Sequence, residues 1–221
     1  MDNYPKEYNG GYVSFLGCKI DLSYKPMIPE LETRFWVKKA IQDINLSRAE
    51  SRGKINILDV FAGSGCIGIA ILKACPEVNR GIFAEIDENL IKQIKINLKI
   101  NKINNRRYSV IQSDIFKNIR GKYDYIFANP PYISLKNKHL VQKSVLDYEP
   151  HLALLGGEDG LLYIRKFLKE ARKFLKEDGK IYLEFDHLQK QELENLLKEL
   201  NYKDYKFYKD QFQKWRFLIY Y

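Results

Sequence analysis

The chain has 221 residues, 45% of them apolar, which is enough to bury the core of a single enzyme-sized domain. Its formal net charge is +9, which favours anionic partners such as RNA, but its lysines are spread along the chain, so the charge by itself assigns no function. No apolar run is long enough to span a bilayer and no secretory leader opens the chain, so we expect a cytoplasmic protein without membrane contact.

The first segments predict a hairpin and a helix. Residues 12–15 and 19–22 read as two short strands around a turn, so we expect residues 1–30 to form an N-terminal extension with a β-hairpin. Residues 32–46 carry apolar side chains on one helical face. Residues 31–221 are then expected to form the main domain.

From residue 55 onward, strands alternate with helices. The expected strands are 55–60, 81–85, 108–112, 123–128, 180–185, 205–208 and 215–220. The expected helices are 66–75, 90–98, 160–175 and 188–200. This alternation predicts an α/β fold with a mostly parallel, seven-stranded sheet, while the short connection between the last two strands makes one strand antiparallel. The loop at 133–159 has little regular pattern, and loops of this length are usually functional.

A glycine-rich turn follows the first strand of this sheet. Gly63, Gly65 and Gly68 fit G-x-G-x-x-G between a strand and a helix, where glycines let the backbone turn sharply and approach a ligand. A dinucleotide would place its pyrophosphate on the helix N-terminus. Asp59, at the end of the strand, would repel phosphate and suits an ammonium group instead, such as that of a methionine moiety.

Two further acids end the next two strands. Glu85 is placed to accept both hydroxyls of a ribose, and Asp114 to accept from an adenine amino group while Ile115 or Phe116 packs on the ring. Each alone would more often be a helix N-cap, but together they predict a nucleoside-bearing cofactor. The expected cofactor site comprises Asp59, Phe61, Ala62, Gly63, Gly65, Glu85, Ile86, Asp114, Ile115 and Asn129.

The tetrapeptide Asn129-Pro130-Pro131-Tyr132 follows the fourth strand. The prolines fix φ and remove two backbone donors, so the Asn129 side chain and the Pro130 carbonyl are held at the carboxyl end of the strand, where open α/β sheets bind ligands. Two acceptors that point the same way suit an –NH2 group. We therefore expect Asn129, Pro130 and Tyr132 to be catalytic, with the tyrosine ring packed on the target plane.

The cysteines and histidines predict no metal site. Cys18, Cys66 and Cys75 have no metal-ligand spacing, and an odd, sparse set fits reduced thiols better than disulfides. The three histidines, His139, His151 and His187, are far apart in the sequence.

With these motifs the chain resembles the HemK/PrmC-type protein-(glutamine-N5) methyltransferases, which modify peptide chain release factors. The resemblance covers nearly the whole chain from about Phe15. Its segments are Phe15-Leu16-Gly17, Met27-Ile28-Pro29, Glu32-Thr33, Asn129 to Ile133, Tyr148-Glu149-Pro150, Ala153-Leu154 and Gly156 to Leu161. Glu184 with Gln189, and Asp210 with Arg216, are similar to the C-terminal signature of the family. The resemblance implies a Rossmann-like methyltransferase fold, S-adenosylmethionine as cofactor and a release factor as protein substrate, and we expect a monomer.

The same resemblance implies a substrate-binding set. Its members are Asn129, Pro130, Pro131, Tyr132, Phe15 and Glu149, with the segment 25–31 at the substrate entrance. The N-terminal helical domain of the family is not expected, because only about ten residues precede the hairpin.

Four positions depart from the family pattern, one of them Asp186, which replaces a glycine expected after Glu184. Glu30 and Leu31 replace an arginine and a proline, and Phe61 replaces the first glycine of the turn, as in some ribosomal RNA guanine methyltransferases. These departures keep two alternatives open. One is an N-methyltransferase that acts on an exocyclic amine of adenine or guanine in RNA or DNA, with contact to nucleic acid or the ribosome. The other is a non-catalytic binding module that retains the cofactor fold, although the intact tetrapeptide disfavours it.

Overall fold

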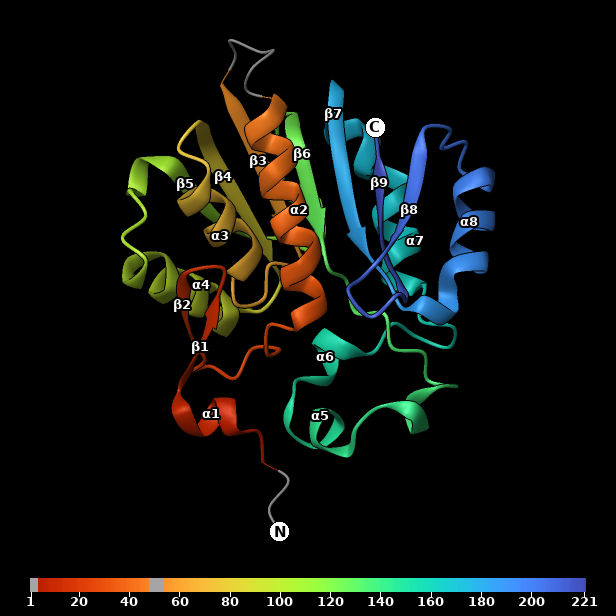
Figure 1. The fold of residues 1–221 in the computed structure, drawn as a ribbon, viewed down its shortest axis with the longest axis horizontal. Helices are drawn as coiled ribbons and strands as arrows, with labels where there is room; N and C mark the ends of the chain where they lie inside the picture. The colour runs from red at the N-terminus through yellow and green to blue at the C-terminus, as the bar shows by residue number, and fades with distance from the viewer. Residues whose placement is uncertain (1–3, 48–53) are drawn as a thin grey trace.

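The computed structural model describes residues 4–47 and 54–221, and its centre is a seven-stranded sheet (Figure 1). In chain order the strands are β3 (Ile55–Val60), β4 (Val78–Glu85), β5 (Tyr108–Gln112), β6 (Tyr123–Ala128), β7 (Leu175–Glu184), β8 (Tyr205–Lys209) and β9 (Trp215–Tyr220). Their order in the sheet is β5-β4-β3-β6-β7-β9-β8. Only β9 runs antiparallel to its neighbours, β7 and β8, which confirms the predicted mostly parallel sheet with one antiparallel strand.

Helices cover both faces of the sheet, because apolar side chains alternate along its strands. In β6, Tyr125 and Phe127 pack with α2 (Leu31–Ser47), α3 (Cys66–Ala74) and α4 (Glu88–Ile100). Ile126 and Ala128 belong instead to the cluster formed with α7 (Leu162–Glu170) and α8 (Lys190–Glu199). The result is a three-layer α/β/α arrangement, visible in Figure 1 with α2 in front of the sheet. None of the described helices is long and apolar enough to cross a membrane.

The predicted hairpin, β1 (Tyr12–Phe15) and β2 (Cys18–Asp21), follows a short helix, α1 (Lys6–Gly10), that sequence reasoning missed. Three buried amides at four-residue spacing, two on α4 and one at its C-cap, hold the hairpin and the residues after it, since such side chains share one helical face. Asn101 Oδ1 accepts the Lys19 N–H (3.0 Å), Asn97 Oδ1 the Asp21 N–H (2.8 Å) and Gln93 Oε1 the Tyr24 N–H (2.8 Å). Asn97 also donates to the Ser64 carbonyl in the glycine-rich turn (2.9 Å), so the hairpin is attached directly to that turn.

Other differences from the predicted elements are local. The expected loop at 133–159 contains a 3-10 turn, Lys138–Leu140, and two short helices, α5 (Lys143–Tyr148) and α6 (His151–Leu154). Helices of four to six residues are too short to show a hydrophobic period. Strand β4 begins at Val78 and β7 at Leu175, earlier than predicted, because pairing with β3 and β6 extends them through polar residues. Further 3-10 turns lie at Asn105–Arg107, Ala171–Phe174 and His187–Gln189.

Candidate functional site

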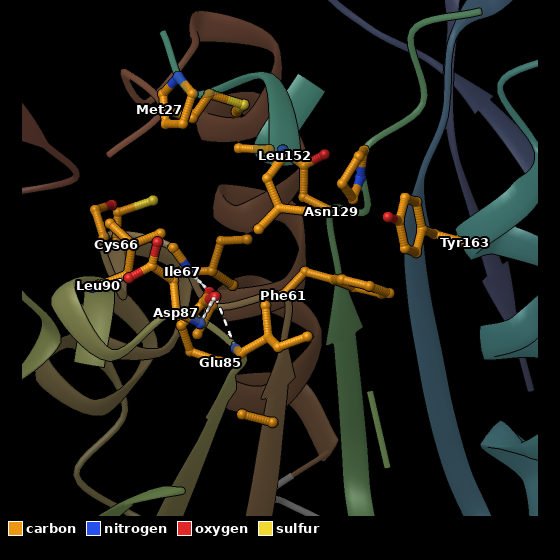
Figure 2. A pocket seen from close by; sticks show the side chains of 18 of the residues that line it. Met27, Phe61, Cys66, Ile67, Glu85, Asp87, Leu90, Asn129, Leu152 and Tyr163 are labelled. Carbon is orange, nitrogen blue, oxygen red and sulfur yellow. Dashed lines mark hydrogen bonds between the residues drawn. The ribbon is translucent and has the colours of Figure 1, made fainter. Parts of the chain in front are cut away.

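A pocket opens at the carboxyl ends of β3, β4, β5 and β6. Because β4 and β6 pair with opposite edges of β3, this is the point where the strand order reverses and where open α/β sheets bind ligands. In the view of Figure 2, Met27 and Leu152 lie across the pocket from Glu85 and Phe61. The pocket therefore lies between the glycine-rich turn on one side and the segment 25–31 and α6 on the other.

Most of the residues predicted for the cofactor line this one pocket. They are Phe61, Ala62, Gly63, Glu85, Ile86, Asp114, Ile115 and Asn129, together with Pro131 from the predicted substrate set. Asp59 and Gly65 are buried and do not line the pocket. Phe15, predicted to bind substrate, is fully buried in the hydrophobic cluster that includes α2 and α3, away from the pocket lining.

Glu85 is fixed by backbone donors. Its Oε2 accepts the Gly63 N–H (2.8 Å), and its Oε1 accepts the N–H groups of Ile86 (2.8 Å) and Asp87 (3.0 Å); Figure 2 shows these bonds. Burial raises the pKa of Glu85, and the three N–H groups oppose that rise by favouring the charged form. A carboxylate oxygen has more than one lone-pair position, so this rigid group still has acceptor capacity toward the pocket.

Asp59 lies under the turn and presents one free acceptor. Its Oδ2 accepts the Gly68 N–H (2.9 Å), whereas Oδ1 is buried and has no hydrogen-bond partner among the described residues. Burial raises the pKa of Asp59 to about 8, the Gly68 N–H opposes this and the nearby Glu85 charge adds to it. A buried carboxylate of this kind is stabilised by a positive charge or a donor that reaches it. An ammonium group fits that requirement, directly or through water, and a phosphate does not.

Phe61 occupies a backbone conformation that normally belongs to glycine. Its φ is +59°, in the left-handed region, which costs an L-residue about 1 kcal/mol or more. Its ring packs edge-on against Tyr163 at 6.3 Å between centroids and contacts Phe167 at the same distance. The departure from the glycine pattern therefore adds an aromatic wall between the turn and α7.

The turn after β5 brings Asp114 and Ile115 to the pocket. Ile115 also has a positive φ, +52°, and Ser113 braces the turn by donating to the Ile115 carbonyl (3.0 Å) and accepting the Asn118 N–H (3.1 Å). Asp114 is exposed and lines the pocket beside Ile115. An acceptor and an apolar side chain next to each other suit a purine with an exocyclic amino group.

On the other side of the pocket, Asn129 joins a buried side-chain network. Its Nδ2 donates to Thr33 Oγ1 (3.3 Å), and Thr33 Oγ1 donates to Glu184 Oε2 (2.8 Å). Glu184 also accepts from Trp36 Nε1 on Oε2 (2.6 Å) and from the Tyr132 hydroxyl on Oε1 (3.0 Å). Asn129 Oδ1 accepts no hydrogen bond from any described residue, so it is available to a ligand in the pocket.

Glu149 and the loop around it close this side. Glu149 Oε2 accepts the Ile28 N–H (3.1 Å), which ties the segment 25–31 to the loop after α5, and burial raises the pKa of Glu149 to about 7. Glu149 does not line the pocket, so this bond to Ile28 supports the pocket wall. On the same side of the pocket, Gln189 Nε2 donates to the carbonyls of Tyr132 (2.9 Å) and Asp159 (3.1 Å).

Sequence reasoning missed several pocket residues. They include Thr33 at the start of α2, Leu152 and Ala153 in α6, and Tyr163 in α7. Thr33 belongs to the Glu32-Thr33 segment that matches the family, but that match assigned it no role, and only the tertiary fold brings these residues to the strand ends. For Leu152 and Ala153 the available signal was the length of the loop at 133–159.

Comparisons with known proteins identify the family to which this chain is similar. Residues 43–158 match the family model of the methyltransferase small domain. The chain is 34% identical over 216 residues to the release factor glutamine methyltransferase of Streptococcus pneumoniae, covering 97% of this chain and 74% of that protein. It is 31% identical over 210 residues to the release factor glutamine methyltransferase of Flavobacterium psychrophilum, covering 93% of this chain and 71% of that protein.

Solved structures share the fold at low identity. The human METTL16 catalytic domain in complex with an RNA hairpin aligns with a TM-score of 0.68 at 15% identity, covering 92% of this chain and 75% of that one. The N-terminal domain of human METTL16 in complex with SAH aligns with a TM-score of 0.61 at 16% identity, with the same two coverages. At these identities the likeness establishes the methyltransferase fold alone.

Proposed function

The chain belongs to the family of release factor glutamine methyltransferases, and from this membership we propose that it methylates the side-chain amide nitrogen of the glutamine in the Gly-Gly-Gln motif of a peptide chain release factor. S-adenosylmethionine is its cofactor, and supplies the methyl group from its sulfonium when bound. We also propose that the protein acts as a cytoplasmic monomer.

The proposal assigns the two halves of the pocket to the two reactants. Glu85 accepts the ribose hydroxyls, the free Oδ1 of Asp59 receives the ammonium group directly or through water, and Asp114 with Ile115 holds the adenine. The observation that carries the proposal is Asn129, whose side-chain oxygen has no partner among the described residues and whose amide lines the same pocket.

In the proposed mechanism, Asn129 Oδ1 and the Pro130 carbonyl each accept one N–H of the target amide, while Tyr132 packs on the amide plane. A carboxamide nitrogen is a poor nucleophile because its lone pair is delocalised, so orientation is the main contribution of the protein. The nitrogen lone pair forms the new N–C bond, the C–S bond breaks, and the extra proton leaves the nitrogen to water. The two acceptors bind more strongly as the nitrogen becomes positive.

A labelled methyl-transfer assay tests the proposal by offering a release factor and total RNA side by side. We expect label in the release factor, located at the Gly-Gly-Gln glutamine by mass spectrometry, and none in a release factor with that glutamine replaced by alanine. Label in RNA alone would assign the chain to the nucleic-acid aminomethyltransferases. Label in neither acceptor would support a binding module without turnover.

A further inference from the structure

The network behind Asn129 has a fixed hydrogen-bond direction. Burial raises the pKa of Glu184, but three donors point at its carboxylate and Arg216 lies within electrostatic reach, and both favour the charged form. The Trp36 indole N–H can only donate, so Glu184 Oε2 acts as an acceptor, and Thr33 Oγ1 donates to the same oxygen. The hydroxyl hydrogen of Thr33, a side chain that is 1% exposed, is therefore directed at Glu184.

A threonine hydroxyl has one hydrogen, so its commitment to Glu184 leaves only lone pairs for Asn129. The group of Asn129 that faces Thr33 Oγ1 at 3.3 Å must then be the –NH2, as the structure has it. The opposite end of the side-chain amide, Oδ1, has no hydrogen-bond partner among the described residues of this pocket. The hydroxyl of Thr33 therefore links the carboxylate of Glu184 to the amide of Asn129.

We propose that Thr33 is a positioning residue that, held by Glu184, sets the orientation of the Asn129 side-chain amide so that its oxygen meets the target nitrogen. The inference rests on the proposed function, because it concerns the acceptors of the same reaction. Glu184 also binds the Tyr132 hydroxyl at 3.0 Å, so one carboxylate positions both side chains of the target site.

The orientation matters because the two ends of an asparagine amide have opposite chemistry. With Oδ1 forward, Asn129 accepts a target N–H and leaves the nitrogen lone pair free for the methyl group. With –NH2 forward, it would repel the target N–H groups or bond the lone pair that has to react. A reversed amide therefore costs turnover even though the residue is intact.

The matched variants Thr33→Val and Thr33→Ser separate direction from packing. Valine keeps the shape of threonine without the hydroxyl, and serine keeps the hydroxyl without the methyl group. We expect Thr33→Val to lower kcat about tenfold or more, and Thr33→Ser to stay within about threefold of the unsubstituted protein. Because Thr33 bonds Asn129 and Glu184 and none of the groups that hold Glu85, the Kd for S-adenosylmethionine should change little in either variant.

A measurement on the protein alone tests the same point without an acceptor. The side-chain 15N–1H signals of Asn129, assigned by their loss in Asn129→Asp, should be two distinct, slowly exchanging resonances in the unsubstituted protein and in Thr33→Ser. In Thr33→Val we expect them to shift and to exchange faster with solvent, because the –NH2 has lost its partner. Thermal unfolding of each variant checks that both are folded.

The outcomes separate this inference from the proposed function. Equal kcat in Thr33→Val and the unsubstituted protein, or an unchanged Asn129 amide signal, would overturn the inference while release factor methylation stands. An equal loss in Thr33→Ser and Thr33→Val would overturn it too, because packing would then explain the effect. If the unsubstituted protein methylated only RNA, the proposed function would fail, and the variants would decide the inference on that acceptor.

Discussion

Glu85 and Glu184 are both buried carboxylates at the ends of strands in one sheet, but different kinds of donor hold them. Glu85 is bound by three backbone N–H groups, the most distant of them 22 positions away in the sequence. Glu184 is bound by three side chains that are 52, 148 and 151 positions away. The half of the pocket that we propose for the cofactor is thus made by local backbone geometry, and the half that we propose for the target by the identities of distant side chains.

The two halves should respond differently to substitution, because one is held by backbone groups and the other by side chains. Backbone donors survive the replacement of the residues that carry them, so the cofactor half should tolerate change around Glu85. Each link of the target half is a single side chain, and removing one leaves a buried polar partner unsatisfied, which costs about 1–3 kcal/mol. A substitution in one half should therefore impair cofactor binding or methyl transfer, but not both to the same degree.

The largest expected effect comes from Asn129→Ala. We expect methyl transfer to fall by about 100-fold or more, because an acceptor that strengthens in the transition state is lost. The Kd for S-adenosylmethionine should stay within about threefold, since Asn129 bonds Thr33 and none of the residues that hold Glu85. Single-turnover kinetics and calorimetric titration measure the two quantities, and a large loss of cofactor affinity would show that the halves are not separate.

Glu85→Ala should have the opposite pattern. Losing a charged acceptor for the ribose hydroxyls is expected to raise the Kd for S-adenosylmethionine about tenfold to 100-fold. The Gly63 N–H also loses its partner, so part of the loss comes from the turn. Titration calorimetry gives the Kd, and saturating cofactor should restore much of the rate. A Kd equal to that of the unsubstituted protein would rule out the ribose assignment.

Asp59→Asn should change how stability depends on pH in the absence of cofactor. The pKa of Asp59 is about 8 in the folded chain, above the ordinary value of 3.8, so folding favours its protonated form. That contribution is complete below about pH 4 and is lost as pH rises to about 8. We expect the unfolding free energy to fall less over this window in Asp59→Asn, by an amount on the order of a few kcal/mol. Urea unfolding at several pH values measures it, and parallel pH profiles would contradict the prediction.

The smallest effect concerns Phe61. Phe61→Gly and Phe61→Ala both remove the ring that packs on Tyr163 and Phe167, but only alanine keeps the strain of φ +59°. We expect the glycine variant to be more stable than the alanine variant by about 1 kcal/mol, reversing the usual order of these residues. Thermal unfolding compares the pair. If alanine were the more stable, the positive φ of Phe61 would carry no strain.

Much of the fold was predictable because its signals are local. The predicted bounds of β3, β5 and β6 match the structure, and the glycine turn with Glu85 lies where the motif placed it. The start of β7 was wrong because Leu175 pairs with Tyr123 ahead of a polar stretch. α5 and α6 were missed because one or two helical turns show no period.

By itself, the sequence determined the sheet, the glycine-rich turn, the acids at the strand ends and the Asn-Pro-Pro-Tyr tetrapeptide. Each is a contiguous pattern whose meaning depends on backbone geometry within one strand–turn–helix unit. Only the tertiary structure decided that Thr33 and Glu184 meet next to Asn129. The same holds for the burial of Phe15 in the core and for the hydrogen bond from the Ile28 N–H, in the segment 25–31, to Glu149. These contacts join distant parts of the chain, and side-chain identity does not reveal which distant residues will meet until the layers have packed.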